Sequence, residues 1–179
     1  MGDPKRPSKK FSTPRNPWKS DDLSQELFLV GSYGLRNKRE LWKSKTELSR
    51  VRKQARTLLA APADVRAREE AKLLKFLHKI GVVSETAAAD DILGLSIENF
   101  LERRLQTVVW KKGLAKTPYQ ARQMITHGHI MLGDKRITIP SYIVRAGEDS
   151  ELKLKPGSTM MVTHPQPAEG HPVEAALAA

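Results

Sequence analysis

Acidic pairs and two histidines are the residues of this sequence whose types could carry catalysis or hold a metal. The carboxylates are adjacent in the chain, at 21–22, 69–70 and 90–91, and neighbours on a helix or strand point apart rather than into one site. His127 and His129 have only Asp134 close by, and the chain has no cysteine. No glycine-rich phosphate loop is present. The sequence therefore predicts a protein that is not an enzyme and that uses no metal or cofactor.

Positive charge is the dominant chemical feature. Among 179 residues, 31 Lys and Arg stand against 20 Asp and Glu, which gives a net charge of +11. The excess is split into an N-terminal block and a block after residue 100, with a near-neutral segment between them. A polyanionic partner is indicated, nucleic acid first and an acidic membrane surface second, and two blocks indicate two contact surfaces. No apolar stretch is long enough to span a membrane and no secretory signal is visible, so we expect a cytosolic protein.

The second block places cations and polar side chains at helix edges and in loops. Such a set suits recognition of folded RNA by its phosphates and its shape. The candidate RNA contacts are Arg103, Arg104, Lys111, Lys112, Lys116, Thr117, Arg122, Gln123, His127, His129, Lys135 and Arg136. The alternatives are that the basic faces only keep the protein soluble, and that the histidines are ordinary turn residues.

The N-terminal block has almost nothing to bury. Residues 1–20 are rich in Lys, Arg and Pro, so we expect a basic, largely extended arm over residues 1–38. Phe11 and Trp18 could stack on bases. The arm adds as candidate RNA contacts Lys5, Arg6, Lys9, Lys10 and Arg15. The alternative is a solvated tail.

Apolar spacing predicts a helical region over residues 39–95. One helix is expected over 39–59 and a second over 64–80, joined as an antiparallel hairpin by the break at Ala61-Pro62. The expected inward residues of the first helix are Leu41, Leu48, Val51, Ala55 and Leu58. Those of the second are Ala67, Ala71, Leu74 and Leu77.

A smaller module is predicted over residues 96–155. A third helix should run from Ser96 to Gly113, and a fourth should start at a Thr117 cap, with Arg122 on its outward face. From residue 129 the period becomes two, which predicts short strands at 130–132, 136–139, 142–144 and 151–154. The predicted fold is α+β: a helical N-terminal region plus a small RNA-binding module of two helices packed on a short, mostly antiparallel sheet. We expect the tail over 156–179 to be disordered.

Five ordered motifs of this module resemble a known family, the fourth small-subunit ribosomal protein. They are LERRLQT (101–107), GLAKT (113–117), ARQMI (121–125), HGHI (127–130) and IPSY (139–142). The opening GDPKR (2–6) and the order ERRLQT are similar to the archaeal and eukaryotic branch. Gln106 stands where many bacterial members have Asp, which puts a local ion pair with the neighbouring helix in question. Gly133-Asp134 stands where Asn-Gly is common, and the zinc cysteines of some bacterial members are absent.

The resemblance implies a structural ribosomal protein. It implies binding to small-subunit ribosomal RNA at a multi-helix junction, nucleation of the assembly of the subunit body, and a part in translational accuracy. It also implies a place in the cytoplasmic small subunit near the channel through which messenger RNA enters, beside the fifth small-subunit ribosomal protein. By matching position, the residues implied to face RNA are Arg104, Thr117, Arg122, Gln123, His127 and His129.

Two other functions are compatible with such a module. It also occurs in pseudouridine synthases and some tRNA synthetases, so the alternative is an accessory of an RNA-modifying enzyme or a stand-alone RNA-binding protein. A catalytic domain would be needed, and residues 1–95 offer only helices and a basic arm. A nonspecific DNA-binding protein is the third possibility, but the mixed polar and aromatic content of residues 100–142 argues against it.

Overall fold

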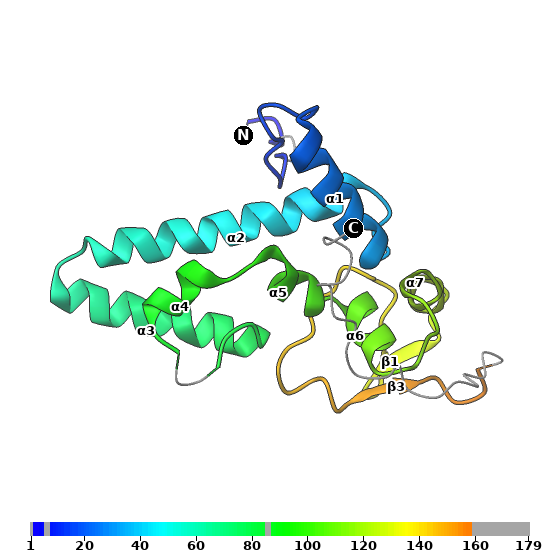
Figure 1. The fold of residues 1–179 in the computed structure, drawn as a ribbon. Coiled ribbons are helices and arrows are strands. Elements are labelled where there is room, and N and C mark those ends of the chain that lie inside the picture. Colours follow the sequence, from blue (N-terminus) through cyan, green and yellow to red (C-terminus); the bar gives the residue numbers. More distant parts are fainter. Residues whose placement is uncertain (1, 6–7, 85–86, 159–179) are drawn as a thin grey trace, which may run out of the picture.

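The computed structural model describes residues 2–5, 8–84 and 87–158 (Figure 1). In chain order the elements are α1 (Ser20–Ser32), α2 (Lys38–Leu59), α3 (Ala63–Ile80), α4 (Ala89–Gly94), α5 (Ile97–Glu102), α6 (Leu105–Lys111), α7 (Pro118–Thr126), β1 (Ile130–Leu132), β2 (Lys135–Arg136) and β3 (Leu152–Leu154). A helical region thus precedes a module of helices and a small antiparallel sheet, and the predicted α+β class is confirmed. None of the described helices combines the length and hydropathy needed to cross a bilayer.

α2 and α3 form the predicted antiparallel hairpin, which extends away from the module in Figure 1. All five expected inward positions of α2 are buried. For α3 the prediction is partly wrong, because Ala67 and Ala71 are exposed while Leu73 and Leu77 are buried. A buried leucine contributes about 1.5–3 kcal/mol, far more than an alanine offers, so α3 turns its leucine side toward α2.

The prediction of an extended arm over residues 1–38 is wrong in its C-terminal part, because Ser20–Ser32 form the helix α1. This helix packs on α2 and α5, in a cluster that includes Leu35 and Leu41. Its buried carboxylate, Glu26, accepts a hydrogen bond from Trp42 Nε1 at 3.0 Å. The part of the arm that lacks a helix therefore ends at residue 19.

The helix predicted from Ser96 to Gly113 is two helices, α5 and α6, broken at Arg103 and Arg104. Backbone pairing with the segment 142–144 causes the break. Val144 N–H donates to Arg103 O at 2.8 Å and Leu105 N–H donates to Tyr142 O at 2.7 Å. The predicted strand at 142–144 is consequently wrong as well, since this segment bridges to Arg104 instead of joining the sheet.

The sheet has β1 in the centre, with β2 and β3 antiparallel on either side. The turn at Gly133-Asp134 connects β1 to β2, as predicted, but β2 ends at Arg136 rather than at residue 139. α6 and α7 pack against each other and against the sheet through a core that includes Leu105, Met124 and Ile130.

The N-terminus of α7 confirms the predicted cap. Thr117 Oγ1 accepts a hydrogen bond from Gln120 N–H at 3.2 Å, and Pro118 stands at the first helical position. Gln120 Oε1 accepts from Lys116 N–H at 2.7 Å, one residue before the predicted partner. Both bonds satisfy donors around the helix N-terminus and fix the direction in which the chain enters α7.

Gly34 brings the helical region into close contact with the module. It lies in the turn between α1 and α2 with φ of +59°, and a Cβ atom here would lie 2.7 Å from Pro118 Cβ. Only a residue without a side chain allows the backbones to approach this closely.

Replacing Gly34 by alanine is expected to lower the free energy of unfolding by about 1–3 kcal/mol, because the added Cβ meets Pro118 and the backbone is left-handed. Urea denaturation measures this change. Gly31→Ala in α1 is the matched control, since its Cβ position is open and alanine favours a helix by up to about 1 kcal/mol. Equal effects at both glycines would contradict the close packing.

Candidate nucleic-acid interface

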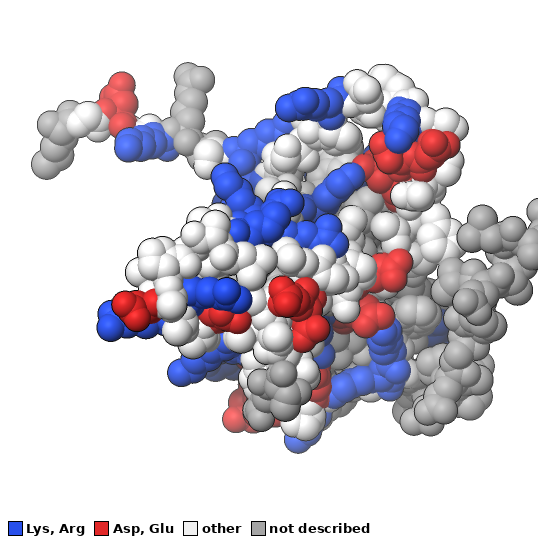
Figure 2. All heavy atoms as spheres, turned by 60° about the vertical axis from the view of Figure 1, so that its left-hand side comes forward, with Lys and Arg blue, Asp and Glu red and all other residues white. Residues whose placement is uncertain are grey.

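Lys and Arg side chains gather into a cluster on the face of the molecule that Figure 2 shows. The cations predicted to contact RNA are distributed over three places: the surface of the module, its boundary with the helical region, and the N-terminal arm. The three groups differ in what their side chains bind within the protein.

Three lysines of the module are exposed in positions where they can meet a ligand. Lys112 and Lys116 are exposed, between α6 and the start of α7, and Lys135 is exposed on β2. Lys111 is exposed too, but its Nζ lies 2.8 Å from Glu102 Oε1. Charges in such positions can approach phosphate at little cost, because they are already in water.

The hairpin β1–β2 and the end of α7 bring three predicted residues together. Gly128, with φ of +78°, separates His127 from His129, and Arg136 Cδ lies 2.8 Å from the position of a Cβ on this glycine. His127 is exposed, whereas His129 is half-buried with its Nδ1 3.0 Å from Ser158 Oγ. Two imidazoles and a guanidinium therefore lie next to one turn. Exposed Gln123 and Thr117 belong to the same helix α7, at its last turns and its cap.

Arg122 does not face outward as predicted, and Arg104 is buried beside it. Both bind Glu40 of α2: Arg104 Nη2 donates to Glu40 Oε2 at 2.6 Å, and Arg122 Nη2 donates to Glu40 Oε1 at 2.7 Å. The Arg104 side chain is only 7% exposed. We call these three residues the Glu40 clasp. The predicted RNA contact of the two arginines stays a prediction, and in this arrangement both guanidinium groups already bind Glu40.

The electrostatics of the clasp follow from its burial. Burial by itself would raise the pKa of Glu40, but the hydrogen bond from Arg122 and the charges of Arg104 and Arg122 lower this pKa below its ordinary value. The pKa of Arg104 is lowered, chiefly by burial and against the opposing effect of Glu40. Two guanidinium groups thus share one carboxylate, which leaves the clasp with a net charge of +1.

Arg103 is likewise held inside the protein. Its Nε donates to Ile80 O at 2.9 Å, and its Nη2 donates to Val144 O and Asp149 Oδ2, both at 2.9 Å. It therefore ties the end of α3 to the loop before β3.

Gln106 completes the boundary between the two parts. It is fully buried, and its Nε2 donates to Gly34 O at 2.8 Å and to Pro118 O at 3.0 Å, while its Oε1 accepts from Arg122 Nη1 at 3.2 Å. A carboxylate here could not donate to the two carbonyl groups. In place of the ion pair that the sequence put in question, a neutral side chain therefore forms hydrogen bonds with both the Arg122 guanidinium and the backbone.

The N-terminal arm runs along α2. Phe11 stacks on Trp42 with ring centroids 6.0 Å apart, and Ser12 N–H donates to Thr46 Oγ1 at 3.0 Å. Phe11 is thus bound to the protein itself, whereas Trp18 is 85% exposed. The predicted cations Lys5, Lys9, Lys10 and Arg15 are all exposed, and Arg6 lies outside the described residues.

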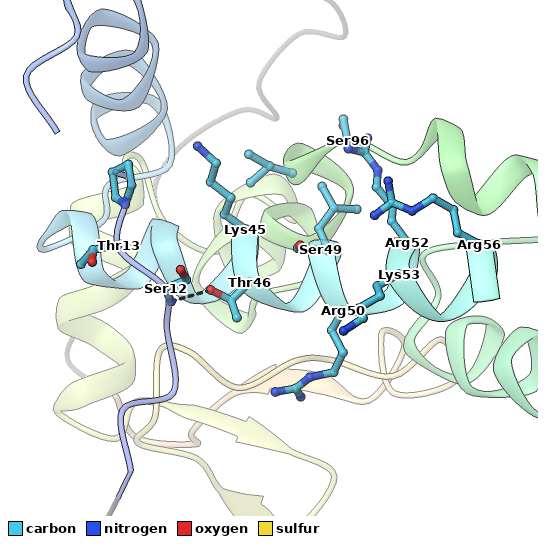
Figure 3. A pocket seen from close by; sticks show the side chains of 13 residues that line it. Ser12, Thr13, Lys45, Thr46, Ser49, Arg50, Arg52, Lys53, Arg56 and Ser96 are labelled. Atoms are coloured by element: carbon cyan, nitrogen blue, oxygen red, sulfur yellow. Dashed lines mark hydrogen bonds between the residues drawn. The ribbon is translucent and has the colours of Figure 1, made fainter. Parts of the chain in front are cut away.

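A basic groove along α2 was missed as a site by sequence reasoning. It has a volume of about 850 Å³ and lies between residues 12–14 and α2 (Figure 3). Its cations are Lys45, Arg50, Arg52, Lys53 and Arg56. The signal was present in the sequence, since these five cations all lie within the helix predicted over 39–59, but the position of the arm beside that helix could not be foreseen.

Among the described residues, no group of three or more His, Asp or Glu is arranged to hold a metal ion. The rings of His127 and His129 have centroids 6.5 Å apart.

Comparisons with known proteins agree over nearly the whole chain. A family model described as "S4 domain" matches residues 103–150, and one described as "Ribosomal protein S4/S9 N-terminal domain" matches residues 5–102. A protein of Ignicoccus hospitalis is 53% identical over 158 residues, which is 88% of this chain and 95% of that protein. One of Sulfurisphaera tokodaii is 49% identical over 171 residues, 95% of this chain and 96% of that protein. Both carry the name "Small ribosomal subunit protein uS4".

Removing the carboxylate of Glu40 is expected to cost about 2–4 kcal/mol of unfolding free energy at neutral pH, because Glu40→Gln leaves two poorly hydrated guanidinium groups without their shared anion. Glu47→Gln, on the same helix, removes the partner of exposed Arg50 and is the control, with an expected cost of about 0.5 kcal/mol or less. Urea denaturation of both variants decides whether the clasp is a structural contact.

The stability difference between the wild type and Glu40→Gln should also depend on pH. A carboxyl with a lowered pKa stabilises the fold above its unfolded pKa of about 4.3, and this stabilisation is lost as the pH falls through the folded value. The difference should therefore be constant near neutral pH and become smaller below about pH 4. A difference that is unchanged at about pH 3 would show that the charge of Glu40 is not its source.

Proposed function

The chain belongs to the uS4 family of small ribosomal subunit proteins, and on this premise we propose that it binds small-subunit ribosomal RNA at a multi-helix junction, as a structural component of the subunit. The observation that carries the proposal is the arrangement of charge. Exposed lysines of the S4 module and the basic face of the helical region lie on two parts of the protein that the Glu40 clasp joins.

The S4 module supplies the first contact surface. Lys112, Lys116 and Lys135 are exposed cations, and Arg136 and the two histidines add planar donors beside them. Lysines of this kind bind phosphates without reading base identity, so the selectivity of the surface must come from the shape of the RNA.

The helical region and the arm supply the second. Two cationic surfaces joined without a flexible linker can bind two RNA segments only if those segments are held at a matching distance and angle. The second contact is then intramolecular and benefits from a high effective concentration. This supports binding at a junction, where several RNA helices meet, and a role in nucleating assembly of the subunit body by stabilising one arrangement of those helices.

Membership of the family supports the remaining parts of the proposal. We place the protein in the cytoplasmic small subunit, near the channel through which messenger RNA enters, with the fifth small-subunit ribosomal protein as a neighbour and with a contribution to translational accuracy. Relatives that match nearly the whole chain are ribosomal proteins, which supports a structural role rather than that of an accessory to an RNA-modifying enzyme.

Neutralising two exposed lysines of the module should weaken RNA binding without unfolding the protein. For Lys112→Gln with Lys116→Gln, we expect the affinity for a small-subunit RNA fragment that contains the junction to fall by about tenfold, and the slope of log K against log salt to fall by about 1–2. Filter binding between about 50 and 200 mM salt measures both. Arg68→Gln with Lys75→Gln, two exposed cations of α3, is the control. Equal losses in both pairs, or a wild-type slope near zero, would contradict the proposal.

A further inference from the structure

We propose that the groove between residues 12–14 and α2 binds a short unpaired stretch of RNA. This inference rests on the proposed function and deepens it: within the second contact surface, outside the S4 module, the groove takes single-stranded rather than double-stranded RNA.

The spacing of the groove residues on α2 makes one continuous polar stripe. Lys45, Ser49, Arg52 and Arg56 are at i, i+4, i+7 and i+11, and therefore lie within about 60° of one another around the helix. Figure 3 shows Arg52 and Arg56 beside Ser96 at one end of the groove and Lys45 toward the other. The stripe runs along the groove, as the phosphates of an extended strand would.

The positive charge of the groove is largely uncompensated. Of the described side chains that line it, none is acidic. Arg50 forms an ion pair with Glu47 at 3.2 Å, and within the described residues the other four cations form none. Whereas Arg104 and Arg122 share the carboxylate of Glu40, the groove concentrates unpaired positive charge in a recess, where it attracts an anion more strongly than on a flat surface.

Arg52 is held in place as a ligand-binding arginine would be. Its Nη2 donates to Leu95 O at 2.5 Å, which fixes the guanidinium at the side of the groove. A guanidinium that is held in this way loses little side-chain freedom when it forms a charge-assisted hydrogen bond with a phosphate.

The other side of the groove fits the rest of a nucleotide. Pro14 and Ile97 add apolar surface on which a base can lie, and the hydroxyl groups of Thr13, Ser49 and Ser96 are in reach of ribose or phosphate oxygens. The arm is anchored there by the bond from Ser12 N–H to Thr46 Oγ1. Apolar and cationic groups in one recess are typical of sites for single strands, whose bases are free to leave a stack.

The size of the recess suits a single strand. The groove holds about 850 Å³ and is lined by α2, by residues 12–14 and by residues 96–97. An RNA duplex is far wider than a single strand and keeps its bases inside the helix, away from the apolar surface of the recess. Unpaired nucleotides, such as those at a bulge or between the helices of a junction, can enter the recess.

The test uses the full chain and a labelled uridylate hexamer, followed by fluorescence anisotropy at low salt. Lys45→Gln with Arg56→Gln removes two cations of the stripe and leaves Arg52 on Leu95. We expect the affinity for the hexamer to fall by about tenfold or more, as for the loss of charge-assisted contacts. The matched control, Arg68→Gln with Lys75→Gln on α3, should change it by less than about threefold. Thermal unfolding of each variant shows that the fold is kept.

Several results would overturn the inference. Equal losses in the two variants would mean that the hexamer responds only to net charge. A fully paired RNA duplex that binds as tightly as the hexamer and loses the same affinity in the groove variant would mean that the ligand class is wrong. A wild type that binds the small-subunit RNA fragment but not the hexamer would refute the groove site and leave the proposed function standing, whereas a wild type that binds neither would refute both.

Discussion

The contact of Glu40 with Arg104 and Arg122 is the constraint on which the arrangement of the molecule depends. One carboxylate of the helical region accepts hydrogen bonds from two arginines of the module, at 2.6 and 2.7 Å. Gln106 and Gly34 extend this boundary with a buried amide and a close backbone contact. Separation of the two parts would break both ion pairs of Glu40 at once, and loss of the carboxylate would leave two like charges together. The boundary is therefore costly to disrupt. Both cationic surfaces are positioned relative to each other through it.

Arginine and lysine have different tasks in this chain. Arg103, Arg104 and Arg122 form the contacts between the two parts, where a planar fork can bind a carboxylate or several carbonyl groups at once. The lysines of the module remain in water. In the groove, arginines and lysines stand without an acidic partner. Net charge thus identifies the class of ligand, but only the internal partners of each cation separate the residues that hold the protein together from those available to RNA.

Local signals predicted the elements, and long-range contacts decided where prediction failed. The α2 core positions, the Thr117 cap and the turn at Gly133-Asp134 depend on neighbours a few residues away and are confirmed. The break between α5 and α6 depends on pairing with residues 142–144, far along the chain, and so was not visible in the helical spacing of 97–112. The outward direction expected for Arg122 failed for the same reason, because its partner, Glu40, is 82 positions away. The groove needed both the stripe on α2, which the sequence contains, and the path of the arm, which it does not reveal.

The pairing of residues 103–105 with 142–144 has a consequence for vectorial synthesis. Synthesis begins at the N-terminus, so α2 and α3 are present before the module. They are neighbours in the sequence and can pack on each other as soon as both have been synthesised. The module cannot close until residue 144 has emerged, and β1 gains its second neighbour only with β3 at Leu152–Leu154. After Glu40 has been synthesised, the ribosome must add 64 more residues before Arg104 is present and 82 before Arg122 is present. The helical hairpin can therefore form before the module is complete, whereas the union of the two halves requires Arg104 and Arg122 and must follow.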